Sequence, residues 1–188
     1  MRSLVLALLA VLAAVPAAAA PPPPDPDPRL ADLERKVAAN ADAIEMLAKQ
    51  VDDLLWFARV GDVADVDKVY LVGPPNPKGE ETYGIAIARH PFKFWCYVFV
   101  PKGLDRGRKS PLLVLPHGGV HGDFGTYHTH IVRELMAEGY VVLAPEYRGS
   151  TGYGKGYREA IDYGGLEVDD CVAARDWGVE TMPFADGG

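Results

Sequence analysis

Apolar residues between positions 29 and 60 recur with the seven-residue spacing of a coiled coil. One heptad position holds Leu30, Val37, Ile44, Val51 and Ala58, and the position three residues later holds Leu33, Asn40, Leu47 and Leu54. Mostly β-branched residues at the first position and leucine at the second favour a parallel two-stranded coiled coil, in which Asn40 would set the register. A single amphipathic helix packed on its own domain fits the same pattern. In both cases the intervening Asp, Glu, Lys and Ala residues predict a solvated face.

The segment before this helix consists of two compositional blocks. Residues 1–20 combine a positive charge at Arg2, an apolar run over Leu4–Val15 and small residues up to Ala20. This is the pattern of a secretory signal peptide, and the apolar run is short for a membrane span. Residues 21–28, PPPPDPDP, form a stiff proline-rich spacer. We therefore expect a secreted or periplasmic protein without a stable membrane span.

Downstream of Gly61 the pattern changes to short β-prone runs. We expect a strand over Val66–Val72 and then an antiparallel hairpin of two further strands. The strands of this hairpin would be Thr82–Arg89 and Phe94–Val100, and residues 90–93 would connect them.

The next segment has the pattern of a βαβ unit. Residues 111–116 and 139–145 are continuous apolar runs, as expected of strands buried on both faces of a parallel sheet. Between them, the spacing of apolar residues predicts a helix over 127–138, with Gly139 placed to cap its end.

A last helix is predicted over Gly165–Trp177, with Val168, Cys171 and Ala174 on the same side as Trp177. An antiparallel hairpin, a parallel βαβ segment and a helix together indicate an α/β architecture over residues 62–188. No strand is expected after this helix, so the sheet is incomplete.

Charge and cysteine content narrow the classes of function. The net charge is −7 and no basic block is present, which argues against a nucleic acid partner. Cys96 and Cys171 could pair in an oxidising compartment, but two buried free thiols are the simpler interpretation.

Histidines are concentrated in residues 115–130, which hold His117, His121, His128 and His130. Two imidazoles four residues apart share a helix face, but here the glycine pair after the first histidine makes a helix improbable. The other two are two residues apart, a spacing that converges only on a strand. We therefore expect no metal site and no cofactor.

Residues 149–156, GSTGYGKG, match the glycine and lysine positions of a phosphate-binding loop. That loop needs Ser or Thr after the lysine to bind magnesium, and Gly156 stands there. We therefore interpret this segment as a glycine-rich loop without a nucleotide.

The sequence His117-Gly118-Gly119 follows the first buried strand. Many serine hydrolases build half of an oxyanion hole in this way, because the glycines allow backbone N–H groups to point at the developing negative charge. A plain glycine turn after a strand would have the same sequence.

Three blocks extend this motif: PHGGVHG (116–122), GYVVLAPEYRGSTGYGKGYREA (139–160) and GGLEVDDCVAARDW (164–177). Together they closely resemble the catalytic domain of the prolyl oligopeptidase family of serine peptidases. The resemblance implies an α/β-hydrolase fold, of which this chain would hold an incomplete sheet. It also implies hydrolysis of a peptide or related acyl bond by a Ser-Asp-His triad.

The same resemblance suggests two sets of site residues. They are His117, Gly118 and Gly119 in an oxyanion loop, and Arg148, Ser150 and Tyr153 in a loop on the substrate side. Val120 and Glu146 depart from the family pattern, which usually has Pro at the first position and Asn or Asp at the second.

A nucleophile elbow is missing from the sequence. The three serines are Ser3, Ser110 and Ser150, and none of them stands in G-x-S-x-G. The last residues, PFADGG, lie about where the strand that leads to the elbow should begin. We therefore expect the N-terminal portion of an exported serine peptidase that lacks its triad and is inactive alone, acting in its complete form on a peptide or small acyl substrate.

Two alternatives remain open. One is an exported coiled-coil module that forms homo-oligomers through residues 29–60 or acts as an adaptor. The other is an esterase or dienelactone-type hydrolase on the same sheet. A half-built sheet would expose a strand edge at 112–115 or 141–144, so we expect poor folding of the isolated chain.

Overall fold

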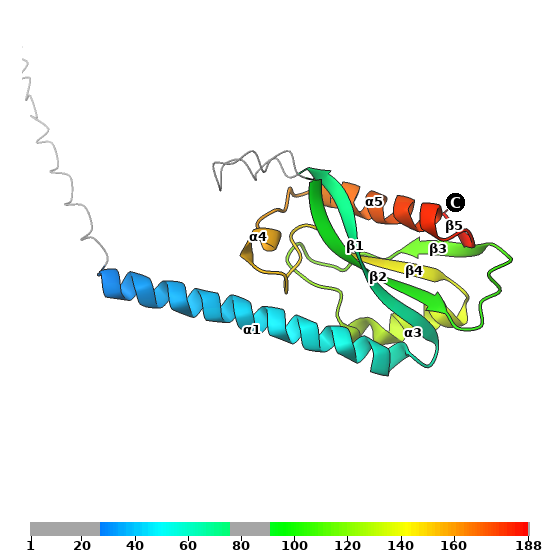
Figure 1. Cartoon of the computed structure of the whole chain (residues 1–188), viewed down its shortest axis with the longest axis horizontal. Helices are drawn as coiled ribbons and strands as arrows, with labels where there is room; N and C mark the ends of the chain where they lie inside the picture. Colours follow the sequence, from blue (N-terminus) through cyan, green and yellow to red (C-terminus); the bar gives the residue numbers. More distant parts are fainter. Residues whose placement is uncertain (1–26, 76–90, 188) are drawn as a thin grey trace, which may run out of the picture.

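A computed structural model describes residues 27–75 and 91–187 of the chain (Figure 1). Its helices and strands, in chain order, are α1 (Pro28–Val60), β1 (Ala64–Pro75), β2 (Pro91–Pro101), β3 (Ser110–Val114), η2 (Thr126–His128), α3 (Thr129–Ala137), β4 (Val141–Glu146), α4 (Lys155–Arg158), α5 (Leu166–Thr181) and β5 (Ala185–Asp186). The strands form one sheet in the order β1-β2-β4-β3-β5. β1, β2 and β4 are antiparallel in turn, whereas β3 runs parallel to both β4 and β5. This mixed sheet with helices confirms the predicted α/β class.

The antiparallel part of the sheet differs from the prediction. β2 pairs with β1, with Val69 opposite Cys96. The predicted connection at 91–93 is wrong, because these residues already belong to β2. Pro91 is tolerated there since the first residue of a strand can lack a ladder donor. The predicted strand over 82–89 lies outside the described residues.

The βαβ unit is confirmed as β3, α3 and β4. Gly139 ends α3 with φ +81°, and its N–H donates to the Met136 carbonyl over 3.2 Å. This left-handed conformation explains the glycine, since other residues adopt it at a cost. β4 is buried throughout, as predicted, but β3 beyond Ser110 is only half-buried or exposed.

The half-burial of β3 follows from its short partner. β5 pairs with β3 only at Ser110 and Pro111, so within the described residues the remainder of β3 has β4 on one side alone. The exposed edge expected at 112–115 or 141–144 therefore belongs to the first of these ranges. The existence of β5 also corrects the expectation that no strand follows the last helix.

Helix α5 faces the sheet through Ala174 and Trp177, as predicted, but not through Val168. Asp170, Ala174 and Gly178 are buried, whereas Val168 is 54% exposed. A Cβ added at Gly178 would lie 2.6 Å from Leu143 Cδ1, so the helix approaches the sheet closely through its small residues.

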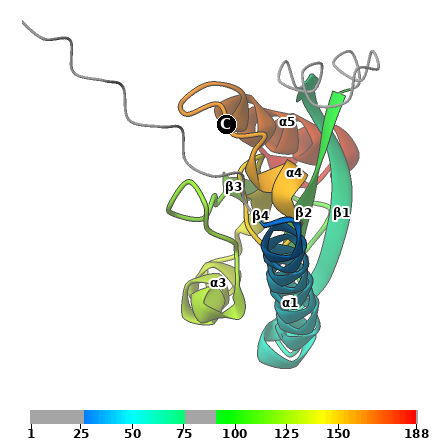
Figure 2. The ribbon, with the colours of Figure 1, turned by 90° about the vertical axis from the view of Figure 1, so that its left-hand side faces the viewer.

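Each face of the sheet has its own core, with α1 and α3 on one side and α5 on the other (Figure 2). The α1 face is rich in aromatic residues and contains Trp56, Val60, Ala64, Tyr97, Phe99, Phe124, Val132, Met136, Val142 and Ala144. The α5 face is mainly aliphatic and contains Leu71, Phe94, Cys96, Val98, Val100, Val141, Leu143, Ala174, Met182 and Ala185. Cys96 and Cys171 are both free thiols.

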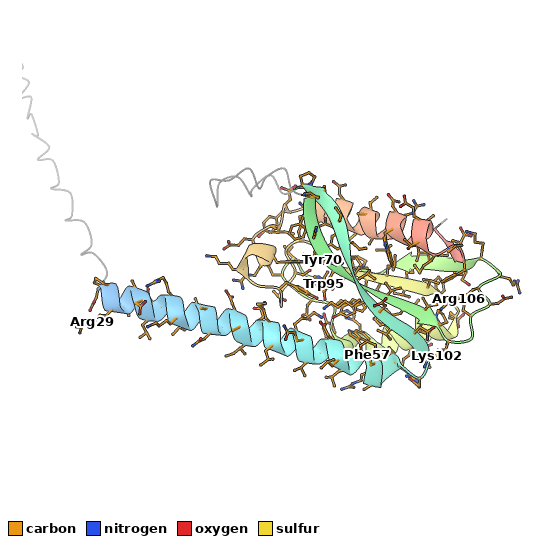
Figure 3. The ribbon with its side chains drawn as sticks, viewed as in Figure 1. Arg29, Phe57, Tyr70, Trp95, Lys102 and Arg106 are labelled. Atoms are coloured by element: carbon orange, nitrogen blue, oxygen red, sulfur yellow. The ribbon has the colours of Figure 1, made fainter. Side chains whose placement is uncertain are left out.

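The predicted helix over 29–60 is confirmed as α1, whose N-terminal part extends beyond the sheet (Figure 1). Figure 3 shows its side chains from Arg29 at the outer end to Phe57 near the inner end. Lys49, Trp56 and Val60 are its buried residues. The apolar heptad positions are all exposed, at Leu30, Leu33, Val37, Ile44, Leu47, Val51, Leu54 and Ala58.

The expectation of a fully solvated polar face on α1 is wrong. Lys49 and Trp56 occupy the heptad position opposite the apolar seam, and they are the residues that pack on the sheet. Docking therefore uses one face of α1 and leaves the heptad face free. Among the described residues, no helix has the length and apolar character that a membrane span requires.

Candidate active site

The candidate site residues lie in the loops that follow β3 and β4. Because these strands are parallel neighbours, their carboxyl ends and the loops after them meet at one edge of the sheet. The Thr151 N–H donates to the Gly122 carbonyl over 2.8 Å, and the His121 Nδ1 atom lies 2.9 Å from the Gly149 carbonyl oxygen. The structure thus brings the predicted oxyanion loop and the predicted substrate-side loop together.

His117 connects the two loops from the inside. It is 4% exposed, its ring stacks on Tyr147 with centroids 4.3 Å apart, and its Nε2 atom lies 2.8 Å from Ser150 Oγ. The Ser150 hydroxyl donates its hydrogen to the Tyr147 carbonyl over 2.6 Å. In the contact between His117 and Ser150, His117 Nε2 is therefore the donor and Ser150 Oγ the acceptor. Burial lowers the pKa of His117 to about 4. This neutral, enclosed imidazole braces the loops and has no access to solvent for proton transfer.

Gly118 and Gly119 carry the exposed part of the loop. Gly119 has φ +77°, a left-handed conformation that favours glycine, and a Cβ at either position would meet nothing within 4 Å. The Tyr147 hydroxyl donates to the Gly119 carbonyl over 2.8 Å, which holds this backbone in place from below. An exposed, braced glycine backbone is the arrangement that oxyanion stabilisation requires. The role of these residues stays a prediction.

Arg148 is part of the interior. Its side chain is fully buried, and its Nε and Nη2 atoms each lie 2.8 Å from an Asp170 carboxylate oxygen. Nη2 also donates to the Pro74 carbonyl over 2.8 Å. The side chain therefore ties the end of β4 to α5 and to β1, and it does not face a substrate.

Ser150 and Tyr153, the other two residues of the predicted substrate-side loop, also point inward. Ser150 is fully buried and engaged with His117 and Tyr147. The Tyr153 hydroxyl is buried without a hydrogen-bond partner among the described residues. Arg148 and Ser150 are therefore enclosed, whereas the half-buried Tyr153 side chain also lines a cavity.

Several cavities adjoin these loops. One, of about 610 Å³, is lined by His121, Thr151, Arg158, Glu159, Ile161 and Tyr163. Another, of about 340 Å³, is lined by residues that include Lys49 of α1, Lys68 of β1 and Tyr153. Tyr70 and Trp95 also line this second cavity and are labelled in Figure 3; their ring centroids lie 4.6 Å apart.

A buried ionic network beneath the loops was missed by the sequence-based reasoning. The Lys49 Nζ atom lies 3.1 Å from Glu146 Oε1, 3.1 Å from Asp53 Oδ1 and 3.2 Å from the Phe124 carbonyl oxygen. Glu146 is fully buried, and its Oε1 atom accepts the Phe124 N–H over 3.1 Å. The departure of Glu146 from the family pattern was the one signal of this network in the sequence.

One carboxylate oxygen of this network accepts no hydrogen bond from the part of the chain that the structure describes. Glu146 Oε2 has no hydrogen-bond partner among the described residues and lies 3.5 Å from His117 Nε2. Burial raises the pKa of Glu146, against the opposing effect of Lys49. Burial would lower the pKa of Lys49, but the carboxylates of Glu146 and Asp53 outweigh it and raise that pKa.

The histidines do not converge on a common point. His121 contacts a backbone carbonyl, and the His128 ring stacks on Phe124 with centroids 4.4 Å apart. Among residues 27–75 and 91–187, no three His, Cys, Asp or Glu side chains are arranged to hold a metal ion.

Comparison with known proteins identifies relatives of this segment. Residues 127–187 match the model of the prolyl oligopeptidase family. Dipeptidyl-peptidase 5 of Aspergillus fumigatus is 34% identical over 95 residues, which are 48% of this chain and 13% of that protein. The uncharacterized peptidase YuxL of Bacillus subtilis is 38% identical over 88 residues, which are 46% of this chain and 13% of that protein. The chain thus spans a small part of the relatives that it matches.

Solved structures of peptidases also resemble this chain. A puromycin-hydrolyzing peptidase of Mycobacterium tuberculosis superposes with a TM-score of 0.51 at 27% identity, over 65% of this chain and 18% of that one. An acylaminoacyl peptidase superposes with the same TM-score of 0.51 at 18% identity, over 66% of this chain and 18% of that one, and supports the fold alone.

Proposed function

We propose that this chain, whose residues 127–187 match the model of the prolyl oligopeptidase family, supplies the oxyanion side of a serine peptidase that acts on peptide or related acyl bonds. The α/β-hydrolase fold expected from the sequence is confirmed by the mixed sheet and by its structural relatives. The family match begins in η2 and covers α3, β4, the loop after β4, α4, α5 and β5, whereas the glycine loop at 117–119 lies before it.

The observation that carries this proposal is the braced glycine backbone in the loop after β3. During acyl transfer the substrate carbonyl oxygen gains negative charge, and each backbone N–H that points at it contributes about 3 kcal/mol. Gly118 and Gly119 are exposed, while Tyr147 and His117 fix the loop from the interior. This division lets the backbone face a substrate without rearranging during the reaction.

The position of β5 supports the same proposal. β5 runs parallel to β3 and pairs with its first two residues, so a strand that continued β5 along β3 would end at the same sheet edge as the glycine loop. A nucleophile elbow needs a strand immediately before it, with its serine exposed at the top of the sheet. The geometry therefore suits a nucleophile that follows β5 and is approached by the N–H groups after β3.

The test has a sequence part and an activity part. We expect the coding sequence after codon 188 to continue in frame through a G-x-S-x-G segment, and a longer product with that segment to hydrolyse a chromogenic dipeptide substrate. We expect no inhibitor-sensitive hydrolysis by the 188-residue chain, because Ser150 is enclosed and Ser110 lies at the start of β3. A longer product with the elbow but without turnover would overturn the peptidase proposal.

A second function is favoured by the free face of α1. We propose that two copies of the chain associate through the exposed heptad positions as a parallel coiled coil. Two of these residues, Ile44 and Leu54, are 68% and 70% exposed, although such side chains are usually covered. The docked face lies on the other side of the helix, so association does not compete with packing on the sheet.

Sedimentation equilibrium of the full chain tests this association. Leu47→Glu at the seam should shift the dimer to monomer, whereas Arg35→Glu on the opposite face of the protruding part should not. A wild-type monomer at tens of micromolar would contradict the proposal.

We also propose that the protein is exported. The support is the composition of residues 1–20, whose charged start, apolar run and small residues suit cleavage by a signal peptidase. Cell fractionation and N-terminal sequencing test it, with a mature end near Pro21 as the expected result and an intact Met1 in the cytoplasmic fraction as the contrary one.

A further inference from the structure

Helix α1 precedes the family-matched residues, yet one of its side chains reaches the base of the candidate site. Lys49 is 4% exposed and lies against Glu146 at the carboxyl end of β4 and against the Phe124 carbonyl in the loop after β3. A single charge from α1 thus contacts both segments from which the site is built.

Two further carboxylates on α1 also contact the segments that follow β3 and β4. Asp52 accepts the Thr126 N–H over 2.9 Å, at the first residue of η2. Glu45 accepts the Gly152 N–H over 2.5 Å, in the loop after β4. The docked face of α1 is therefore complementary to backbone donors of both loops, which places Lys49 at a fixed point between them.

From Lys49, a line of contacts leads to the glycine loop. The partner carboxylate, Glu146, has its free Oε2 atom 3.5 Å from His117 Nε2. His117 in turn donates to Ser150 over 2.8 Å, and Gly118 follows His117 directly in the chain. Whatever fixes the charge on Glu146 therefore also acts on the imidazole that joins the two loops.

We infer that Lys49 is a positioning residue of this site, which acts through Glu146 on His117 and so on the glycine loop. While Lys49 balances Glu146, the imidazole stays neutral and donates to Ser150. Without that balance, the buried carboxylate would have His117 as its nearest titratable neighbour, and the imidazole would take up a proton. Nδ1, which lies 3.3 Å from the Gly118 carbonyl oxygen, would then become a second donor and would pull on the loop.

Other charged and titratable groups surround Glu146 and His117 and contribute to the electrostatic potential there. They are Asp53 on α1, Lys68 on β1, Tyr97 on β2, Asp123 in the loop after β3, His128 in η2 and Tyr147 after β4. Lys68 is itself paired with Asp53, so it does not replace Lys49 as a partner for Glu146. The charge opposite Glu146 is therefore mainly that of Lys49.

The experiment is an NMR titration of the histidines in the 188-residue chain, with His117 identified by the signal that His117→Gln removes. We expect the pKa of His117 to rise by about one pH unit or more in Lys49→Met, because a positive charge is lost and a buried carboxylate is left unpaired. In Lys49→Met/Glu146→Gln, where both charges are removed, it should return towards the wild-type value of about 4. Packing changes alone would not produce this reversal.

A matched control and a second comparison keep the inference falsifiable. Lys36→Met removes an exposed lysine of α1 that pairs with Asp32 at 2.8 Å, and it should leave the His117 titration unchanged. An unchanged His117 pKa in Lys49→Met, or an equal rise in Lys36→Met, would overturn the inference. If Lys49→Met does not fold, Glu146→Gln is compared with the wild-type chain: loss of the carboxylate should lower the pKa of His117 further, and an equal pKa in these two would overturn the inference.

The catalytic meaning of this coupling rests on the proposed peptidase function, but its measurement does not. The titration requires no turnover, so an inactive chain leaves the result intact. Conversely, the absence of a G-x-S-x-G segment would remove the peptidase proposal and leave the coupling between Lys49 and His117 standing.

Discussion

The two faces of the sheet are each covered by a helix that inserts one charged side chain, yet the two buried ion pairs differ in kind. On the α5 face, Asp170 receives Arg148 through two hydrogen bonds of 2.8 Å and also accepts the Arg148 N–H over 3.0 Å. On the α1 face, Lys49 pairs with Glu146, whose second oxygen has no hydrogen bond among the described residues. Both carboxylate oxygens of the first pair accept hydrogen bonds, so we call that pair saturated. In the second pair, Glu146 Oε2 accepts none among the described residues and lies beside His117.

This difference indicates how the chain divides two tasks that both depend on the end of β4. Glu146 is the last residue of β4 and pairs with Lys49 on the α1 side, whereas Arg148 lies two residues beyond the end of the strand and pairs with Asp170 on the α5 side. The saturated pair fixes α5 and β1 in place, which is a matter of stability. The unsaturated pair sets the protonation of His117 below the glycine loop, which is a matter of the site.

The largest effect is expected from breaking the saturated pair. Asp170→Ala leaves a buried guanidinium without its carboxylate, so the free energy of unfolding should fall by about 3–5 kcal/mol. Urea denaturation measures it, and Asp169→Ala, at the exposed neighbouring position, should change it by less than about 0.5 kcal/mol. Equal losses in the two variants would show that the saturated pair does not hold this face.

The second effect concerns acid. The folded state holds the pKa of His117 at about 4, below its ordinary 6.5, so it binds fewer protons than the unfolded state. This contribution to stability is present above pH 6.5 and is lost as the pH falls to about 4, by about 3 kcal/mol in total. Glu146, whose pKa is raised, works in the opposite direction.

Denaturation at several pH values isolates the histidine. His117→Gln should flatten the loss of stability between pH 6.5 and 4, whereas His130→Gln at an exposed position should keep the wild-type profile. A steep profile retained in His117→Gln would assign the acid sensitivity to another group and would weaken the contrast between the two pairs.

A third prediction tests how tightly α1 is seated. Gly152 has φ +85°, and a Cβ there would lie 2.7 Å from Lys49 Cβ. Gly152→Ala should therefore cost about 2 kcal/mol or more, from backbone strain together with the displacement of α1. Gly139→Ala, at φ +81° with open space around it, should show the strain alone, about 1 kcal/mol. Thermal unfolding compares them, and equal losses would mean that α1 gives way freely.

The smallest effect concerns the thiols on the α5 face. Burial raises the pKa of Cys171 to about 11 and that of Cys96 well above its ordinary value, so few thiolates are present at neutral pH. Iodoacetamide at pH 8 should label Cys171 slowly and Cys96 only after unfolding, as mass spectrometry of the labelled peptides would show. Rapid labelling of Cys96 in the native chain would indicate that this face opens.

The elements with a strong local pattern could be predicted from the sequence. The runs that became β3 and β4 are apolar, and Gly139 ends the intervening helix as a residue with positive φ should. The hairpin was wrong in its connection because Pro91 can begin a strand as readily as it can belong to a turn. The glycine loop was located correctly because its position depends only on the end of the strand before it.

Burial of charged residues could not be predicted from the sequence, because it depends on partners that are distant in the chain. Asp170 and Lys49 belong to residue types that are rarely buried, so local pattern placed both of them in solvent. Each is buried because a partner distant in the chain, Arg148 or Glu146, supplies the opposite charge. The offset of α5 and the face through which α1 docks were missed for the same reason.

The length of α1 has a mechanical consequence. A helix of 33 residues is about 50 Å long, and it turns as one rod because each residue is hydrogen-bonded to the next turn. Ile44 lies on its outer seam, and Lys49 lies five residues further along. A torque applied at the protruding end of α1 would therefore be transmitted along the helix to Lys49 in the interior. A partner bound to that end would act mechanically on the residues beneath the glycine loop.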